Sequence, residues 1–368
     1  MKRFILRLVA VVTTCSLAAT AIANPQIERV IGTLDSSELV TIVGSGFGAD
    51  GPQIILYDDF NDTNPGQEIP LDSPQVGKWS SSKNSPKAVL PSRSGNGSSF
   101  LIYDGSLDVS RRFQAEFGNQ REIFFSYWVR IPPGTRFTGR DGGIKRFSTD
   151  SSWKMAWLMD GAEGYKSNDD LYDVCLPTFI GNRFDVHGNS YVPGSGRAIG
   201  NDWWSWDEWI RIAVTVKDPN TNPIDNISFD MTSASKGSIA YTIPALDNKI
   251  AFNKHQYDRI NFPGWIRESG GESVQPQYDD IYISIGPGAE ARVEFANAPV
   301  YENATVIELT LAKEWSEGQI EVEVPRSVSL DGEDWYVFVT NANGERNTLG
   351  IAVANCDCPK PPTLFAQR

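Results

Sequence analysis

The chain has 368 residues, and 46 Asp and Glu residues outnumber 33 Lys and Arg residues, which gives a formal net charge of −13. So acidic a chain is a poor match for nucleic acid or for an anionic membrane surface, because both attract basic proteins. The length leaves room for one large domain and one small one.

The first 23 residues have the pattern of a secretory signal peptide. Lys2, Arg3 and Arg7 precede an apolar run over 8–18, and Ala21-Ile22-Ala23 follows with the small residues of a cleavage site. The apolar run is too short to span a bilayer, and no second run of spanning length follows. We therefore expect a protein that is secreted, periplasmic or held at the cell surface, and that does not span the membrane.

Two short strands are predicted next, over 25–30 and 39–43, and they lead into the turn Gly44-Ser45-Gly46-Phe47-Gly48. Glycines in such a turn are expected to adopt positive φ angles. Further alternating strands are expected close to the end of the chain, over 292–295, 306–311, 315–325 and 335–344.

These two ends together resemble an IPT/TIG domain, a small immunoglobulin-like sandwich. Its early strands end in a similar glycine turn, and its later strands resemble Trp315–Pro325 and Trp335–Gly344. The resemblance covers about 25–56 and 290–352, and it implies that a large domain is inserted between the two parts. Two sequential domains with a short N-terminal extension are the alternative.

The middle of the chain carries short runs rich in β-branched and aromatic residues between turn clusters, which is typical of an all-β domain. In Trp209–Lys217, alternation predicts that Ile210, Ile212, Val214 and Val216 face a core. The run Trp153–Met159 places Trp153 and Trp157 on one face with Met155 and Met159, and we interpret that face as core.

The order of these motifs resembles the concanavalin A-like lectin/glucanase class of jelly rolls. The similar features are Asp58-Asp59-Phe60, Trp79, the strand at Trp209 and the strand Tyr278-Asp279-Asp280-Ile281-Tyr282. The fold class implied is all-β, with a large jelly-roll sandwich and a small immunoglobulin-like one. The Glu-x-Asp-x-x-Glu strand of the glucanases does not occur within 57–288, which argues against glycosidase activity.

Paired acidic residues stand at both ends of the large domain and would meet if its terminal strands pair. Because neighbouring strand residues point to opposite faces, one Asp of each pair would face a shared site, and we favour Asp59 and Asp280. Oxygen ligands suit a structural Ca²⁺, which the resemblance to jelly-roll carbohydrate modules also implies. Solvated acids or turn caps are the alternative. No organic cofactor is expected.

Four tryptophans, Trp203, Trp204, Trp206 and Trp209, fall within seven residues. Exposed aromatic rings of this kind can stack on the apolar faces of sugars, so we predict a ligand-binding role. The alternative is that some of these rings fill the core of the sandwich.

A third group contains Arg183, His187, Tyr191 and Lys154. Jelly-roll polysaccharide lyases use a cation to neutralise a uronate carboxylate and a His, Lys or Tyr to remove the C5 proton. The Arg-x-Glu-x-Arg and Gln-Ile-His strands of alginate lyases with this fold are absent. An ordinary polar strand face is therefore the alternative to a catalytic site.

The prediction as a whole is an exported protein that binds a polysaccharide or cell-surface glycan. A polysaccharide lyase, or less plausibly a hydrolase, is the catalytic alternative, and a structural surface protein is the third. The expected divisions are a signal peptide (1–23), the two parts of the small domain (25–56 and 290–352), the jelly roll (57–288) and a tail (353–368). The pairing of Cys175, Cys356 and Cys358 and the oligomeric state stay open.

Overall fold

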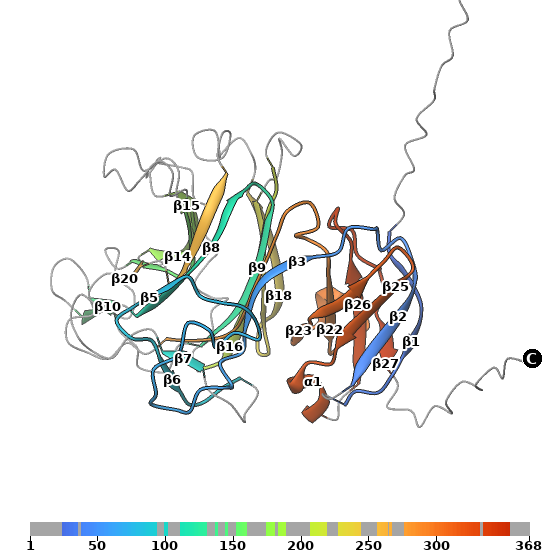
Figure 1. Ribbon diagram of the computed structural model, residues 1–368, viewed down its shortest axis with the longest axis horizontal. Coiled ribbons are helices and arrows are strands. Elements are labelled where there is room, and N and C mark those ends of the chain that lie inside the picture. The colour runs from blue at the N-terminus through green and yellow to red at the C-terminus, as the bar shows by residue number, and fades with distance from the viewer. Residues whose placement is uncertain are drawn as a thin grey trace, which may run out of the picture.

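The computed structural model confirms the all-β class. It describes residues 24–35, 38–93, 99–101, 111–130, 137–138, 144–145, 152–159, 174–180, 183–188, 207–218, 227–243, 256–263, 265–266, 276–331 and 334–353. Its strands form a large sandwich and a small one, which lie side by side (Figure 1). The predicted signal peptide and nearly all of the predicted tail lie outside the described residues.

The first sheet of the large sandwich has eight strands, in the order β20-β12-β14-β13-β19-β8-β5, with β15 paired to β14. Their bounds are β5 (Ser81–Lys83), β8 (Arg112–Gln120), β12 (Ser152–Lys154), β13 (Trp157–Met159), β14 (Val174–Ile180), β15 (Arg183–Gly188), β19 (Tyr257–Phe262) and β20 (Trp265–Ile266). A separate hairpin joins β10 (Phe137–Thr138) and β11 (Ile144–Lys145).

The second sheet of the large sandwich has nine strands, in the order β18-β17-β16-β9-β21-β3-β4, and β7 pairs with both β21 and β6. Their bounds are β3 (Gln53–Asp58), β4 (Val76–Gly77), β6 (Lys87–Val89), β7 (Ser99–Leu101), β9 (Ile123–Arg130), β16 (Trp209–Val216), β17 (Ile227–Ser233), β18 (Gly237–Ile243) and β21 (Gln277–Ile285). All strand pairs of both sheets are antiparallel.

The core of the large sandwich lies between these two sheets. Ile210, Ile212, Val214 and Val216 of β16 all belong to it, which confirms the face predicted from alternation. Phe113 of β8 contributes from the opposite sheet. Trp157 is 6% exposed and therefore buried, as expected, although it lies outside the cluster between the two sheets, which Met155 and Leu158 enter. Strand structure is interrupted between β12, which ends at Lys154, and β13, which begins at Trp157. The inward and outward alternation of side chains is therefore not continuous from one strand to the other.

The small sandwich joins the two ends of the chain. One sheet has the order β1-β2-β25-β24, and the other has the order β23-β22-β26-β27. Their bounds are β1 (Gln26–Ile31), β2 (Leu39–Ser45), β22 (Arg292–Ala296), β23 (Ile307–Leu309), β24 (Ala312–Trp315), β25 (Gln319–Glu323), β26 (Trp335–Thr340) and β27 (Ile351–Val353). The glycine turn after β2 has positive φ at Gly46 (73°) and Gly48 (79°), as predicted.

The nine-stranded sheet lies between the eight-stranded sheet and the small sandwich (Figure 1). Phe124 of β9, Ala213 of β16 and Tyr282 of β21 project from its second face and pack with Ala289 and Leu311 from the side of the small sandwich. The nine-stranded sheet is therefore covered on both faces, whereas the outer face of the eight-stranded sheet points away from the small sandwich.

Helix is confined, among the described residues, to α1 (Arg326–Asp331) and the 3₁₀ turn η3 (Tyr301–Asn303). These two elements have six and three residues, so no helix of the described residues is long enough to span a membrane.

Candidate functional site

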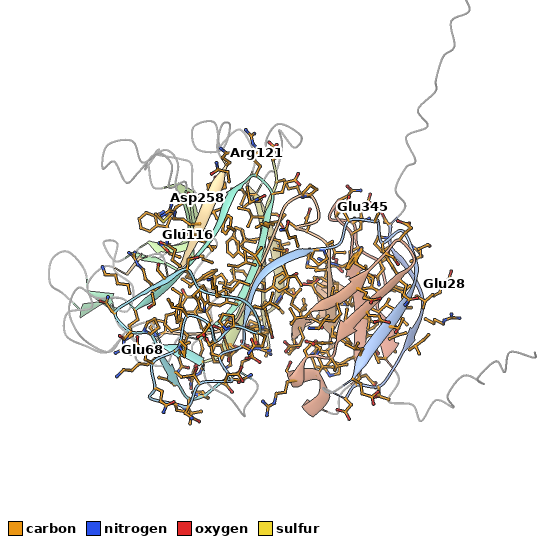
Figure 2. The ribbon with its side chains drawn as sticks, viewed as in Figure 1. Glu28, Glu68, Glu116, Arg121, Asp258 and Glu345 are labelled. Carbon is orange, nitrogen blue, oxygen red and sulfur yellow. The ribbon has the colours of Figure 1, made fainter. Side chains whose placement is uncertain are left out.

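The outer face of the eight-stranded sheet is the candidate functional site. In β8, Phe113 and Ala115 point into the core, so Gln114 and Glu116 belong to the opposite face. The same alternation in β19 sends Ile260 inward and leaves its neighbours on the outer face. Figure 2 shows the Glu116 side chain on this sheet.

One row of side chains crosses three neighbouring strands of this face. The register sets Gln114 of β8 opposite Asn261 of β19, and Asn261 opposite Trp157 of β13. Directly opposed residues of antiparallel strands share a face and lie within contact distance. We call Gln114, Asn261 and Trp157 the outer row, and it combines two amides with an indole ring.

Asn261, at the centre of the outer row, is a buried amide. It is only 2% exposed, and its Nδ2 donates to the Sδ of Met159 at 3.2 Å. Its Oδ1 accepts no hydrogen bond within the described part of the chain. A buried amide oxygen without a donor is costly, so this atom is suited to accept a hydrogen bond from a ligand.

A second row carries charge. The register sets Glu116 opposite Arg259, and Arg259 opposite Met159. The Arg259 guanidinium donates to both carboxylate oxygens of Asp258, at 2.8 and 3.1 Å, and lies 3.6 Å from Glu116 Oε1. Gln114 also donates to Glu116, at 2.7 Å. Arg259 therefore has two carboxylate neighbours, and Lys83 and Arg112, opposite each other in the register, add two cations at the end of the same face.

The residues predicted to be catalytic lie mostly in the same sheet. Trp157 pairs with Cys175 of β14, and Cys175 pairs with His187 of β15, so the backbone of His187 continues the line of the outer row. Lys154 of β12 is opposite Thr178, and Arg183 is opposite Ile180. The side chains of these three predicted residues, and Tyr191 entirely, lie outside what the structure describes, so their roles stay predictions.

The predicted tryptophan cluster is only partly described. Trp209 begins β16, where it is half-buried and pairs with Arg130 of the nine-stranded sheet. It therefore belongs to the other sheet and not to the outer row. Trp203, Trp204 and Trp206 lie outside the described residues.

The terminal strands of the large sandwich pair as predicted: β3 pairs with β21, and Asp58 is opposite Ile281. Asp59 and Asp280 then line one small cavity of about 40 Å³, next to Arg93 and Glu308. Arg93 Nε donates to Asp280 Oδ2 at 2.6 Å, and Arg93 also forms an ion pair with Glu308. Burial, and then the nearby Asp280, raise the pKa of Asp59.

This arrangement fits a calcium ion poorly. The Arg93 guanidinium already supplies positive charge to Asp280 and Glu308, and a metal would compete with it for the same carboxylates. Asp59 accepts from Gln75 Nε2 at 2.6 Å and from the backbone N–H of Asn61 at 3.1 Å. Across the described residues, no three His, Cys, Asp or Glu side chains gather in a metal-holding group. Calcium binding stays a prediction that awaits measurement.

The sequence analysis missed Gln114, Asn261 and Arg93. Polar residues alternate with apolar ones in Arg112–Phe117 and again in Tyr257–Phe262, so strand periodicity could have identified the outer face. Arg93 stands in a turn-rich stretch with no periodicity, and its partners Asp280 and Glu308 are 187 and 215 residues away. No local signal could have identified its role.

No family model matches the sequence, and no curated protein matches it. Solved structures do align with it. The PL-14 alginate lyase from Aplysia kurodai is 10% identical over 60% of this chain and 97% of its own, with a TM-score of 0.41. Alginate lyase vAL-1 from Chlorella virus is 14% identical over 56% and 93%, with a TM-score of 0.35.

Arcelin-5, a lectin-like defence protein from Phaseolus vulgaris, is 9% identical over 56% of this chain and 92% of its own, again with a TM-score of 0.35. Similarities of this strength do not assign an activity to the chain. Its function has to be inferred from its own residues.

Proposed function

We propose that this protein binds a glycan on the outer face of the eight-stranded sheet. The observation that carries the proposal is the outer row. In it Gln114 lies opposite Asn261, and Trp157 lies opposite Asn261 on the next strand of the same face. Amide groups can both donate to and accept from sugar hydroxyls. Trp157 is 6% exposed, so its ring packs beside the amides and does not offer an open face to a sugar. The buried, unsatisfied Oδ1 of Asn261 supports a ligand at this place.

The described part of the outer face carries charges of both signs. Arg259 is paired with Asp258 and Glu116, and Lys83 and Arg112, which the register sets opposite each other, add two cations to the same face. The proposal therefore rests on the amides and not on the net charge of the face. An uncharged, hydroxyl-rich polymer is the simplest ligand for such amides.

A polysaccharide lyase is the second candidate. It is favoured by one observation, the register that aligns His187 with the outer row through Cys175. In that case His187 or Tyr191 would remove the C5 proton, and Arg183 or Lys154 would neutralise the uronate carboxylate.

One panel experiment separates the two candidates. The full-length protein would be passed over immobilised uncharged polysaccharides and uronic acid polymers, and each mixture would be monitored for the ultraviolet absorbance of unsaturated uronates. Retention on an uncharged polymer without absorbance is the expected result. Absorbance on a uronic acid polymer that is lost in His187→Ala would identify a lyase instead.

The small sandwich is proposed to be a rigid spacer into which the large domain is inserted. The pairing of β2 with β25, which joins residues 39–43 to 319–323, supports this arrangement. Release by limited proteolysis of a stable fragment close to 57–288 would support insertion, whereas independent folding of 290–352 without 25–56 would contradict it. Export through residues 1–23 is likewise a proposal, which N-terminal sequencing of the exported protein would test.

A further inference from the structure

Three arginines surround one carboxylate between the two sandwiches. Glu294 of β22 forms an ion pair with Arg211 of β16. Arg292 Nε and Arg346 Nη2 lie 3.2 and 3.9 Å from the other carboxylate oxygen, which also accepts a hydrogen bond from Tyr301 at 3.0 Å. Both oxygens of Glu294 therefore have partners, and three positive charges face one negative charge. We call the three arginines and Glu294 the arginine cluster.

The centre of the arginine cluster is closed off from solvent. The side chains of Arg211, Arg292 and Glu294 are 1%, 4% and 0% exposed, and only Arg346 reaches the surface, at 21%. Because solvent screens buried charges poorly, a guanidinium without a counter-charge is costly at this depth. The excess of positive charge is therefore expected to attract a further anion.

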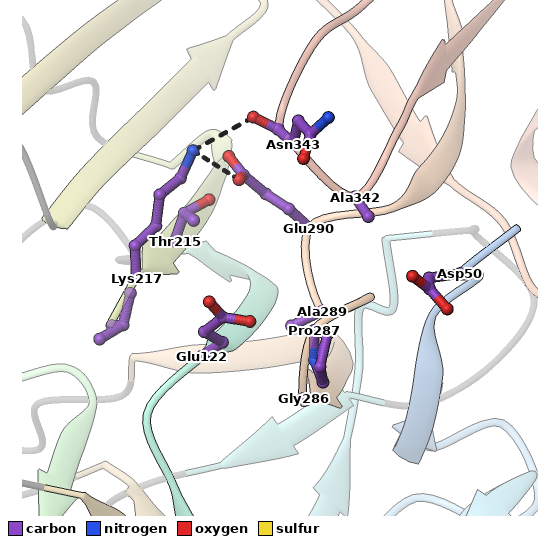
Figure 3. A pocket seen from close by; sticks show the side chains of 11 residues that line it. Asp50, Glu122, Thr215, Lys217, Gly286, Pro287, Ala289, Glu290, Ala342 and Asn343 are labelled. Atoms are coloured by element: carbon purple, nitrogen blue, oxygen red, sulfur yellow. Dashed lines mark hydrogen bonds and ion pairs between the residues drawn. The ribbon is translucent and has the colours of Figure 1, made fainter. Parts of the chain in front are cut away.

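The neighbouring carboxylates do not supply that anion. Arg292 Nη1 donates to the backbone oxygen of Glu290, at 2.8 Å. The Glu290 carboxylate pairs instead with Lys217, with 2.7 Å between Oε2 and Nζ, as a dashed line in Figure 3 marks. Asp230 attracts Arg211 electrostatically, but no ion pair joins the two in the described part of the chain.

Arg211 supplies the independent observation that points to a ligand. Its Nη2 donates to Glu294, whereas its Nε and Nη1 are buried and have no hydrogen-bond partner among the described residues. An arginine has five N–H donors, and most of them are on these two nitrogens. Buried donors without an acceptor are rare and costly, so we expect an acceptor from outside the chain beside them.

The surroundings of Arg211 limit the size of that acceptor. The register sets Arg211 between Trp128 of β9 and Thr232 of β17, which are 5% and 0% exposed. Thr232 Oγ1 already shares a hydrogen bond with Ser238 Oγ, at 3.2 Å. The small sandwich covers this face of the sheet, so a compact ligand suits the site better than a large one.

We propose that one chloride ion binds beside Arg211 in the arginine cluster. The ion would accept hydrogen bonds from Nε and Nη1 of Arg211, and its charge would offset part of the positive excess. A water molecule could accept the same hydrogen bonds, but it would leave that excess uncompensated. The ion would stabilise the attachment of the small sandwich to the large one, and its binding is independent of the glycan site on the outer face.

The dependence of stability on chloride tests the proposal in the full-length protein. Sodium chloride would replace sodium methanesulfonate at constant ionic strength, and the melting temperature would be measured at each step. We expect a saturable rise of about 2 °C or more between about 1 mM and about 100 mM chloride, because a ligand that binds only the folded state stabilises it. Sodium bromide should have the same saturable effect.

A variant and a crystal assign the effect to this place. Arg211→Met removes both the charge and the free donors, so its melting temperature should no longer rise with chloride. Arg29→Met, on exposed β1, is the matched control and should respond like the wild type. Crystals of the wild-type protein soaked in sodium bromide should give an anomalous scattering peak in contact with Arg211, and this readout does not depend on the folding of a variant.

Equal melting temperatures in chloride and methanesulfonate would overturn the proposal and assign the free donors to water. A chloride effect that persists at full size in Arg211→Met would also overturn it, as would bromide peaks that all lie away from Arg211. Glycan binding should be the same with and without chloride, so the failure of one site can be told apart from the failure of the other.

Discussion

Arg211 of β16 and Glu294 of β22 form an ion pair between the two sandwiches, with 2.5 Å between Arg211 Nη2 and Glu294 Oε1. Their side chains are 1% and 0% exposed. Arg292 Nε lies 3.2 Å from the second carboxylate oxygen, and Tyr301 donates to that oxygen at 3.0 Å. Arg292 also stacks on Phe124 of the large sandwich, 4.6 Å from the ring centre. The small sandwich is thus attached through a buried charge cluster.

Glu294 is the centre of this cluster, and we predict that removing its charge costs more than removing one arginine. Burial alone would raise the pKa of Glu294, but Arg292 and then Arg211 lower it to about 2. Glu294→Gln leaves Arg211 and Arg292 buried without a carboxylate, which should cost about 3–5 kcal/mol. Arg211→Met leaves Glu294 with Arg292 and should cost less.

Chemical denaturation of the two variants measures this order. Glu314→Gln, on the exposed part of β24, is the matched control and should change the free energy of unfolding by less than about 0.5 kcal/mol. A larger loss in Arg211→Met than in Glu294→Gln would contradict the account of the cluster.

Asp58 gives a prediction about pH. Burial raises its pKa to about 7, although hydrogen bonds from Trp79 Nε1 and the backbone N–H of Phe60 oppose the shift. The folded state therefore keeps a proton on Asp58 that the unfolded chain releases near pH 4. The contribution of this group to stability is complete below about pH 4 and is lost as the pH rises to about 7.

The free energy of unfolding measured from pH 4 to pH 8 should contain this fall, with a slope on the order of 1 kcal/mol per pH unit from this group. In Asp58→Asn the slope should be smaller, because the side chain no longer titrates. An identical slope in the variant would show that Asp58 does not titrate in this range.

Arg93 gives a prediction about metal removal. Because its guanidinium neutralises Asp280 and Glu308, we expect EGTA to leave the melting temperature unchanged. Arg93→Met should lower the stability by about 3–5 kcal/mol, since it leaves buried carboxylates without a cation. Arg29→Met, on exposed β1, is the control. A melting temperature that falls with EGTA and recovers with Ca²⁺ would instead establish the calcium predicted from the sequence.

Local periodicity predicted which face of a strand enters the core, but it did not predict that the other face is also covered. The alternation in Trp209–Lys217 identified the core face of β16 correctly. The opposite face, which carries Arg211 and Lys217, has the composition of a solvated surface, yet Arg211 is fully buried. Its partner Glu294 is 83 residues away in another sandwich, and no local pattern encodes that contact.

In the large sandwich, too, one feature could be predicted from the sequence and another could not. The pairing of β3 with β21 could be predicted because their Tyr-Asp-Asp segments resemble each other. The outer row could not, because it needs the order of strands across the sheet: β8 and β13 both flank β19, although they are far apart in the sequence. Register between distant strands is decided by the whole core and is not contained in any one segment.

The most direct test of the proposed glycan site is a pair of matched double variants, measured for affinity to the polymer that retains the wild-type protein. Gln114→Ala/Glu116→Ala alters the outer face, and Gln319→Ala/Glu321→Ala removes the same two residue types, with the same spacing, from β25 of the small sandwich. The account predicts that the first variant binds about tenfold more weakly or worse, and that the second binds like the wild type. Equal affinity of both variants would contradict a glycan site on the outer face.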